Sequence, residues 1–291
     1  MERHMSDDLS PLVARRRLRV ELRNARQESR RTQDQVAAAM EWSLSKIIRI
    51  ESGAVGMSTN DLRALLRHYG IKDQSKTAEL LALGRLSRER PWWSAHKDLI
   101  SPQLGQLIDY EAAAAVICSF QPLVIPGLLQ TEEYARVMIG QFGNASSRER
   151  LDNIVKIRMK RQELLERPDH PKAFFVLDEA VIRRWVGGKD VMRRQLEHLV
   201  AMSGKRDVTV EIVPFSIGLH PGLQGPFVIL DFPDPSDDEL LYLENSRGEL
   251  VIRADPQEIS GYHDKFEQLQ KQTPGVTASI TFLDQIIKEM K

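Results

Sequence analysis

The segment from residue 31 to residue 53, RTQDQVAAAMEWSLSKIIRIESG, constrains this chain most, because it predicts two short helices joined by a tight turn. Thr32 opens a Thr-x-x-Gln capping box, which satisfies free backbone N–H groups at the start of a helix. Ser43 is an N-cap type of residue and begins the second helix. Ile47 and Ile50 then fall on one face of that second helix, which predicts that this face is buried.

The opposite face of the second predicted helix, Ser43–Ser52, carries groups suited to DNA. An α-helix fits the major groove, and hydroxyl, ammonium and guanidinium groups bind base edges and phosphates. We therefore predict a recognition helix here, with Leu44 against a thymine methyl group, and with Thr32 and Gln33 at backbone phosphates. The side chains expected to face the major groove are Ser43, Leu44, Ser45, Lys46 and Arg49.

The same segment resembles the helix-turn-helix of the phage-repressor (Cro/C1, or xenobiotic-response-element) class. In that class TQ opens the second helix, and S-x-SKI-x-RIE-x-G forms the third. The turn often carries a left-handed glycine, whereas Glu41 and Trp42 stand there in this chain. A non-glycine residue in that conformation costs about 1 kcal/mol. We expect the turn to form nonetheless, because Trp42 would cover the junction with a large apolar surface.

Charge is unevenly distributed although the net charge is zero. Residues 1–90 contain 18 Lys and Arg against 12 Asp and Glu, and the remaining residues contain 23 against 29. A basic segment before an acidic one is typical of a DNA-binding domain joined to a second domain with another role. The alternative is a chance imbalance on solvated helices. Most arginines of the first predicted helix, residues 12–28, are expected to be solvated, with some near its start at phosphates.

Periodicity predicts a multidomain chain. Residues 1–11 are polar and predicted to be disordered, and residues 12–90 form an all-α domain of about five helices, the last from about Gln74 to Arg90, where Pro91 is expected to end it. Residues 91–291 mix helices and strands. Their strands cluster between residues 208 and 253, which favours an α+β fold with a mixed or antiparallel sheet over a doubly wound one.

Composition excludes several other classes of protein. No run of eighteen apolar residues is present, so no transmembrane helix is expected, and the first residues lack the apolar region of a secretory signal. A lone Cys118 excludes an intrachain disulfide and a cysteine-based zinc site, so we expect a cytoplasmic protein. The chain lacks HExxH, GxGxxG, Walker and GxSxG motifs, and we expect neither a cofactor nor a metal, and no enzyme activity.

Two weak candidates for chemistry lie in the second domain. Asp178 and Glu179 end a predicted strand, where paired carboxylates can serve acid–base chemistry, although such a pair more often opens a helix. His220 lies between glycines and prolines, in a loop that either lines a pocket or, as we prefer, forms a simple hairpin or crossover.

The segments WWSAHKDLISPQLGQLIDYEAAA, SFQPLVIPGLLQTEEYAR, PFVILDFPDP and LLYLEN occur in this order in the second domain. They are similar to the large C-terminal domain of an actinobacterial regulator family, in which it follows a phage-repressor-type head. The family is described as antitoxin-like transcriptional regulators, often encoded beside a small partner protein. The resemblance implies such a partner; composition and spacing do not.

Three functions remain open. The first is a sequence-specific regulator that binds double-stranded DNA. It would act as a homodimer, because a single helix-turn-helix domain buries too little surface for strong specificity. The second is a small-molecule sensor with a pocket near His220. The third is an antitoxin-like protein that holds a small partner and binds DNA only for autoregulation. No membrane partner is expected.

Overall fold

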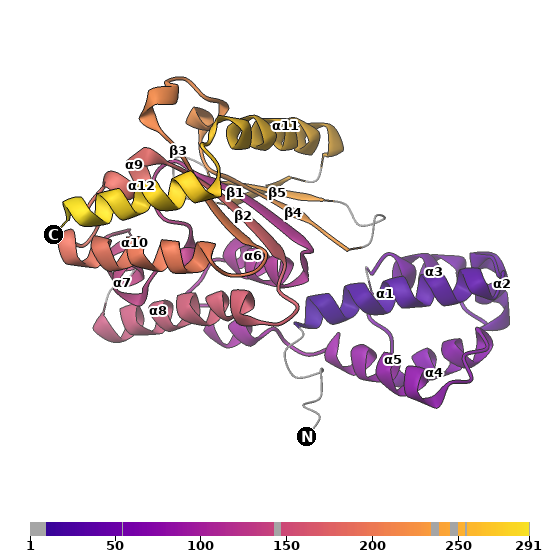
Figure 1. Ribbon diagram of the computed structural model, residues 1–291. Coiled ribbons are helices and arrows are strands. Elements are labelled where there is room, and N and C mark those ends of the chain that lie inside the picture. Colours follow the sequence, from indigo (N-terminus) through magenta and orange to yellow (C-terminus); the bar gives the residue numbers. More distant parts are fainter. Residues whose placement is uncertain are drawn as a thin grey trace. The chain divides into compact units, whose positions relative to one another are not determined.

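The computed structural model (Figure 1) describes residues 10–53, 55–142, 147–233, 239–244, 250–253 and 255–290. The chain divides into two compact units, with the boundary between Ala95 and His96. Residues 1–9 of the predicted disordered segment lie outside the described residues. The last two residues of that segment, Ser10 and Pro11, cap and open the first helix.

The described part of the N-terminal unit is helical, as predicted. Each helix begins after a residue whose side chain accepts a backbone N–H, namely Ser10, Thr32, Ser43, Ser58 and Asp73. The last helix ends earlier than the predicted residue 90, and a 3-10 turn, η1 (Trp92–His96), follows it. The five helices are α1 (Pro11–Glu28), α2 (Gln33–Ala39), α3 (Leu44–Glu51), α4 (Thr59–His68) and α5 (Gln74–Leu86).

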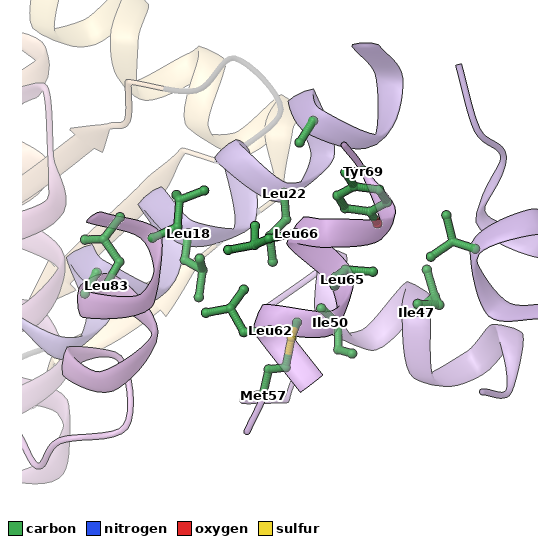
Figure 2. Packing of buried hydrophobic residues seen from close by; sticks show 14 of the residues in the cluster. Leu18, Leu22, Ile47, Ile50, Met57, Leu62, Leu65, Leu66, Tyr69 and Leu83 are labelled. Atoms are coloured by element: carbon green, nitrogen blue, oxygen red, sulfur yellow. The ribbon is translucent and has the colours of Figure 1, made fainter. Parts of the chain in front are cut away.

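One hydrophobic core holds the five helices together (Figure 2). Leu18 and Leu22 of α1 lie against Leu62 and Leu66 of α4, and Ile47 of α3 belongs to the same cluster. These side chains are almost fully buried, and the burial of each one contributes about 1.5–3 kcal/mol to the stability of the folded unit. The core therefore fixes the orientation of α3, whose apolar face is part of it.

The C-terminal unit is built on a six-stranded sheet with the order β3-β2-β1-β4-β5-β6. Strands β1, β2 and β3 are parallel, whereas β4, β5 and β6 are antiparallel to their neighbours. The sheet is therefore mixed, as predicted. The strands are β1 (Val116–Gln121), β2 (Lys172–Asp178), β3 (Val208–Val213), β4 (Phe227–Asp231), β5 (Leu240–Glu244) and β6 (Leu250–Arg253).

Helices cover both faces of this sheet (Figure 1). Alternate residues of β1 point to opposite faces. Cys118 and Phe120 pack with Phe266 and Leu269 of α11, whereas Ile117 and Ser119 point toward the other layer. The helices and 3-10 turns of the unit are α6 (Pro102–Ala113), η2 (Gly127–Leu129), α7 (Glu132–Phe142), α8 (Arg148–Gln162), η3 (Glu163–Glu166), α9 (Glu179–Arg183), α10 (Lys189–Ser203), η4 (Phe215–Ile217), η5 (Pro221–Gln224), α11 (Pro256–Gln272) and α12 (Val276–Glu289). Among the described helices, none is both long and apolar enough to cross a membrane.

Candidate nucleic-acid interface

The turn between α2 and α3 adopts the left-handed geometry that the sequence places at residue 41. Glu41 has φ 54°, in the region that favours glycine. The Glu41 N–H donates to the Ala38 carbonyl at 3.3 Å, and the Trp42 N–H donates to the Ala37 carbonyl at 2.9 Å. These two bonds form a Schellman motif, which ends α2 and leads directly into α3. Trp42 packs against the hydrophobic core, so the apolar cover expected of it is confirmed.

Replacing Glu41 with glycine is expected to raise the free energy of unfolding by about 0.5–1 kcal/mol, because glycine adopts this conformation without steric cost. The Glu41 side chain is exposed, so the substitution removes no buried contact. Denaturant unfolding of the full chain measures the change. Ala38→Gly, at an exposed and ordinarily helical position of α2, is the matched control and should lower stability by about 1 kcal/mol. A loss of stability in Glu41→Gly would contradict the strain argument.

Helix α3 presents a mixed apolar and polar surface to solvent. Ile47 and Ile50 are buried, while Ser45 and Arg49 are exposed. Leu44 is 39% exposed and accompanies them on the outer side of the helix. No described residue forms a side-chain hydrogen bond or ion pair with Arg49. The outer face of α3 therefore combines a free guanidinium with a hydroxyl and an apolar side chain.

Ile48 was not among the predicted contact residues, yet its side chain is 44% exposed on the same helix. It follows the buried Ile47 directly, so it cannot share that residue's face of a helix. This spacing is the sequence signal that could have identified it. An exposed isoleucine and an exposed leucine on a short helix form an apolar surface suited to thymine methyl groups.

Three of the predicted contact residues, Thr32, Ser43 and Lys46, have structural roles within α2, α3 and their surroundings, and Gln33 has another that is described below. Thr32 Oγ1 accepts from the Gln35 N–H at 3.2 Å, and Ser43 Oγ accepts from the Lys46 N–H at 3.2 Å. Lys46 Nζ lies 3.4 Å from Asp61 Oδ2 and 3.7 Å from the centroid of the Trp42 ring. The Lys46 ammonium would have to leave these partners, at least in part, to reach a base or a phosphate.

A buried ion pair lies behind α2 and α3. Glu51, at the end of α3, accepts from Arg26 Nε at 2.7 Å, from Arg26 Nη2 at 3.1 Å and from Gln33 Nε2 at 2.8 Å. The side chains of Arg26 and Glu51 are 15% and 5% exposed. Gln33, predicted to bind phosphate, thus donates to a buried carboxylate and joins α2 to α1 and α3.

The sequence did not indicate this network. Glu51 lies four residues after Ile47, and this helical spacing places a carboxylate on the buried face. That position, and an arginine near the end of α1, are the signals that point to it. The network also shows that some arginines of α1, which were expected to be solvated, have partners within the unit. Arg15, Arg17 and Arg19 likewise donate to other helices or caps of the unit, namely to the Ser87 carbonyl, Glu79 and the Ser52 carbonyl.

In the C-terminal unit, Asp178 and Glu179 act at the start of a helix. Asp178 Oδ1 accepts from the Ala180 N–H at 2.7 Å and caps α9, and Glu179 accepts from the Phe215 N–H at 2.7 Å. Asp178 Oδ2 also lies 3.1 Å from His220 Nε2. The loop of His220 consists of 3-10 turns, and His220 is buried and lines a pocket of about 450 Å³. The loop is therefore both a crossover and a pocket wall.

Among the described residues, one group could place three ligand atoms around a metal ion. Atoms of Asp231, Glu239 and His263 lie within 4.8 Å of one another. His263 Nε2 lies 3.2 Å from Glu239 Oε2 and 3.5 Å from Asp231 Oδ1, and the hydrogen bond to Asp231 raises the pKa of His263. The raised pKa favours a protonated His263 ring, whose positive charge is attracted to both carboxylates.

The geometry of the N-terminal unit defines a helix-turn-helix protein. In agreement, the family described as a helix-turn-helix domain matches residues 17–80. A second family, described as a domain of unknown function (DUF5753), matches residues 104–285. The chain belongs to this DUF5753 family and carries a helix-turn-helix domain before it. Comparisons with curated proteins and with solved structures found no match.

Proposed function

We propose that the protein is a sequence-specific, DNA-binding transcriptional regulator that inserts α3 into the major groove. The observation that carries the proposal is the outer face of α3, where Arg49, whose side chain has no partner among the described residues, lies beside exposed Ser45 and Leu44. Arg49 would bind a guanine edge, and Leu44 a thymine methyl group. Ser43, Ser45 and Lys46 would complete the contacts in the groove, and Thr32 and Gln33 would bind phosphate.

We further propose that the protein acts as a homodimer in the cytoplasm. A single helix-turn-helix contacts only a few base pairs, and two heads on half-sites about one helical turn apart would supply the missing specificity. The chain would then belong to the phage-repressor (xenobiotic-response-element) class of regulators, in the actinobacterial, antitoxin-like family that its sequence resembles. No catalytic role is part of the proposal.

Mapping the bound sites across the genome of the source organism tests the proposal. Fragments recovered with the wild-type protein should share a two-fold symmetric motif, whose half-site spacing reports the dimer. Recovery of fragments without a common motif would contradict sequence-specific binding. If a common motif is found, the genes beside the bound sites would identify the process that the protein regulates.

Binding to the mapped operator is expected to weaken steeply with added salt. The N-terminal residues are rich in Lys and Arg, and each neutralised phosphate releases counterions. For a dimer that contacts about six phosphates, affinity should fall roughly 10³-fold between 50 and 200 mM salt. A mobility-shift titration measures this slope. A flat response to salt would contradict electrostatic binding by the basic unit.

A second candidate function is binding of a small partner protein by the C-terminal unit. Large apolar side chains surround the His220 loop, among them Phe215, Leu223 and Leu219, the last 88% exposed. Clusters of this kind are typical of protein interaction sites. Purification of the tagged protein from its source organism, with Leu219→Ser and Phe215→Ser as the matched variant, tests this role. A stoichiometric small protein lost from the variant would support it.

A further inference from the structure

A pocket of about 400 Å³ lies on the face of the C-terminal sheet that is opposite α11. Ser119 of β1 forms part of its floor, beside Phe175 of β2 and Val228 of β4, which the strand register places directly across from it. Helices α6, α7 and α8 provide the walls. This volume is within the range of small-molecule sites. We call it the α8 pocket.

Two arginines of α8 line the α8 pocket, and in the described part of the chain only Arg161 forms an ion pair. Arg161 donates from Nε to Glu111 Oε2 at 2.7 Å and from Nη2 to Glu111 Oε1 at 2.6 Å. This bidentate pair is nearly buried, with 11% and 2% of the two side chains exposed. The charge of Arg161 is therefore compensated within the protein.

Arg158 lies one helical turn before Arg161 and has no such partner. Its Nη1 donates to the neutral Gln130 Oε1 at 2.8 Å, and the described residues place no carboxylate within 4.0 Å of it. Burial, together with repulsion from Arg161, lowers the pKa of Arg158 to about 10, so the guanidinium is still charged at neutral pH. Arg158 is half-buried, and a cation that is partly removed from water without a counter-ion is costly.

Glu244 of β5 also lines the α8 pocket, but it does not neutralise Arg158. No ion pair joins the two side chains in the described part of the chain. Partial burial raises the pKa of the Glu244 carboxyl, although attraction to Arg158 opposes that shift. The excess positive charge at Arg158 is thus only distantly balanced.

The floor of the α8 pocket contains an unpaired donor. Ser119 is 2% exposed, and its Oγ has no hydrogen-bond partner among the described residues. Buried hydroxyl groups are normally hydrogen-bonded, so an unpaired one that faces a pocket points to a ligand atom. Gly127 keeps the region open, because a Cβ there would lie 3.0 Å from Arg158 Nη1 and 3.2 Å from Arg161 Nη1.

We propose that the α8 pocket binds a small organic monoanion, a carboxylate with an apolar body. The carboxylate pairs with Arg158 and accepts a hydrogen bond from the Ser119 hydroxyl, and the apolar body lies on Phe175 and Val228. The Arg158 guanidinium, which no carboxylate of the described residues approaches within 4.0 Å, matches one negative charge, and its planar donors match the geometry of a carboxylate. This inference gives a ligand class to a sensor role, at a pocket other than the one near His220 that the sequence suggested, and it does not depend on DNA binding.

Calorimetric titration of the full-length wild-type protein tests the proposal. The probes are octanoate and 3-phenylpropanoate, each compared with its uncharged amide. At least one acid should bind, and its amide should bind at least about tenfold more weakly, because charge-assisted hydrogen bonds are the stronger ones. Binding of neither acid, or equal binding of acid and amide, would overturn the proposal. Neither result bears on operator binding, which is measured separately.

Three variants locate the binding site. Arg158→Met should weaken binding of the acid at least about tenfold and Ser119→Ala severalfold, whereas Arg148→Met, at an exposed position of α8, should leave it unchanged. Unaltered binding by Arg158→Met would overturn the assignment. If Arg158→Met fails to fold by circular dichroism, Ser119→Ala decides: unchanged acid binding overturns the proposal.

Discussion

Glu51→Ala is expected to lower the free energy of unfolding of the N-terminal unit by about 3–5 kcal/mol. Glu51 accepts three hydrogen bonds from Arg26 and Gln33, all at 3.1 Å or less. Truncation would leave a buried guanidinium without its counter-ion. Hydrogen exchange of the α1–α4 amides, followed by mass spectrometry on the full chain, measures the loss in this unit separately from the C-terminal unit.

Two controls distinguish a buried charge pair from a general effect of charge. Glu79→Ala removes the surface partner of Arg17, whose side chain is 42% exposed, and should cost less than about 1 kcal/mol. The double variant Arg26→Met with Glu51→Leu should recover much of the loss, since apolar residues often replace a buried ion pair without cost. A loss in Glu51→Ala no larger than that in Glu79→Ala would show that the network adds little stability.

Arg49→Ala is expected to weaken operator binding by about 1–3 kcal/mol, roughly 5- to 150-fold, and to relax specificity at one base pair. The reason is that Arg49 is exposed on α3 and free to form a bidentate contact with guanine. Lys46→Ala should have a smaller effect, because Lys46 already pairs with Asp61 and lies over the Trp42 ring. Mobility-shift titration at one fixed salt concentration measures both changes. The mapped operator reports the affinity, and single-base variants of it report the specificity.

Arg85→Ala is the matched control for Arg49→Ala. Arg85 is an exposed arginine of α5, which packs against α1 and α4 rather than α3. Both variants remove one positive charge, so any difference between them reports position and not net charge. Equal affinities of Arg49→Ala and Arg85→Ala would contradict the assignment of α3 as the recognition helix.

Local rules accounted for most of the secondary structure. Capping residues such as Thr32 and Ser43 satisfy free N–H groups within a few residues of themselves, so helix starts can be predicted from short segments. The left-handed residue in the turn was expected from the resemblance to the phage-repressor class, and Glu41 adopts that conformation. The last helix of the N-terminal unit was predicted to continue to residue 90 but ends at Leu86, where Ser87 caps it. Pro91, which was expected to end the helix, restricts only the residue before it and so does not account for an end at Leu86.

Side-chain partners from distant segments could not be predicted in this way. Glu51 meets an arginine 25 residues earlier, and Arg161 meets Glu111, 50 residues earlier. Each of these charged residues resembles a solvated one in its local sequence. Only the packing of helices shows which charges are buried and paired, and which one, Arg158, lacks a counter-ion among the described residues.

The sequence by itself determined the two-part organisation, the helix-turn-helix with its unusual turn, and the mixed α and β content of the second unit. These depend on capping, periodicity and charge within short segments. The tertiary structure alone decided the order of the six strands and the presence of Ser119 and Arg158 in the lining of one pocket. Those features arise where segments far apart in the chain meet, since burial and charge compensation depend on every neighbour at once.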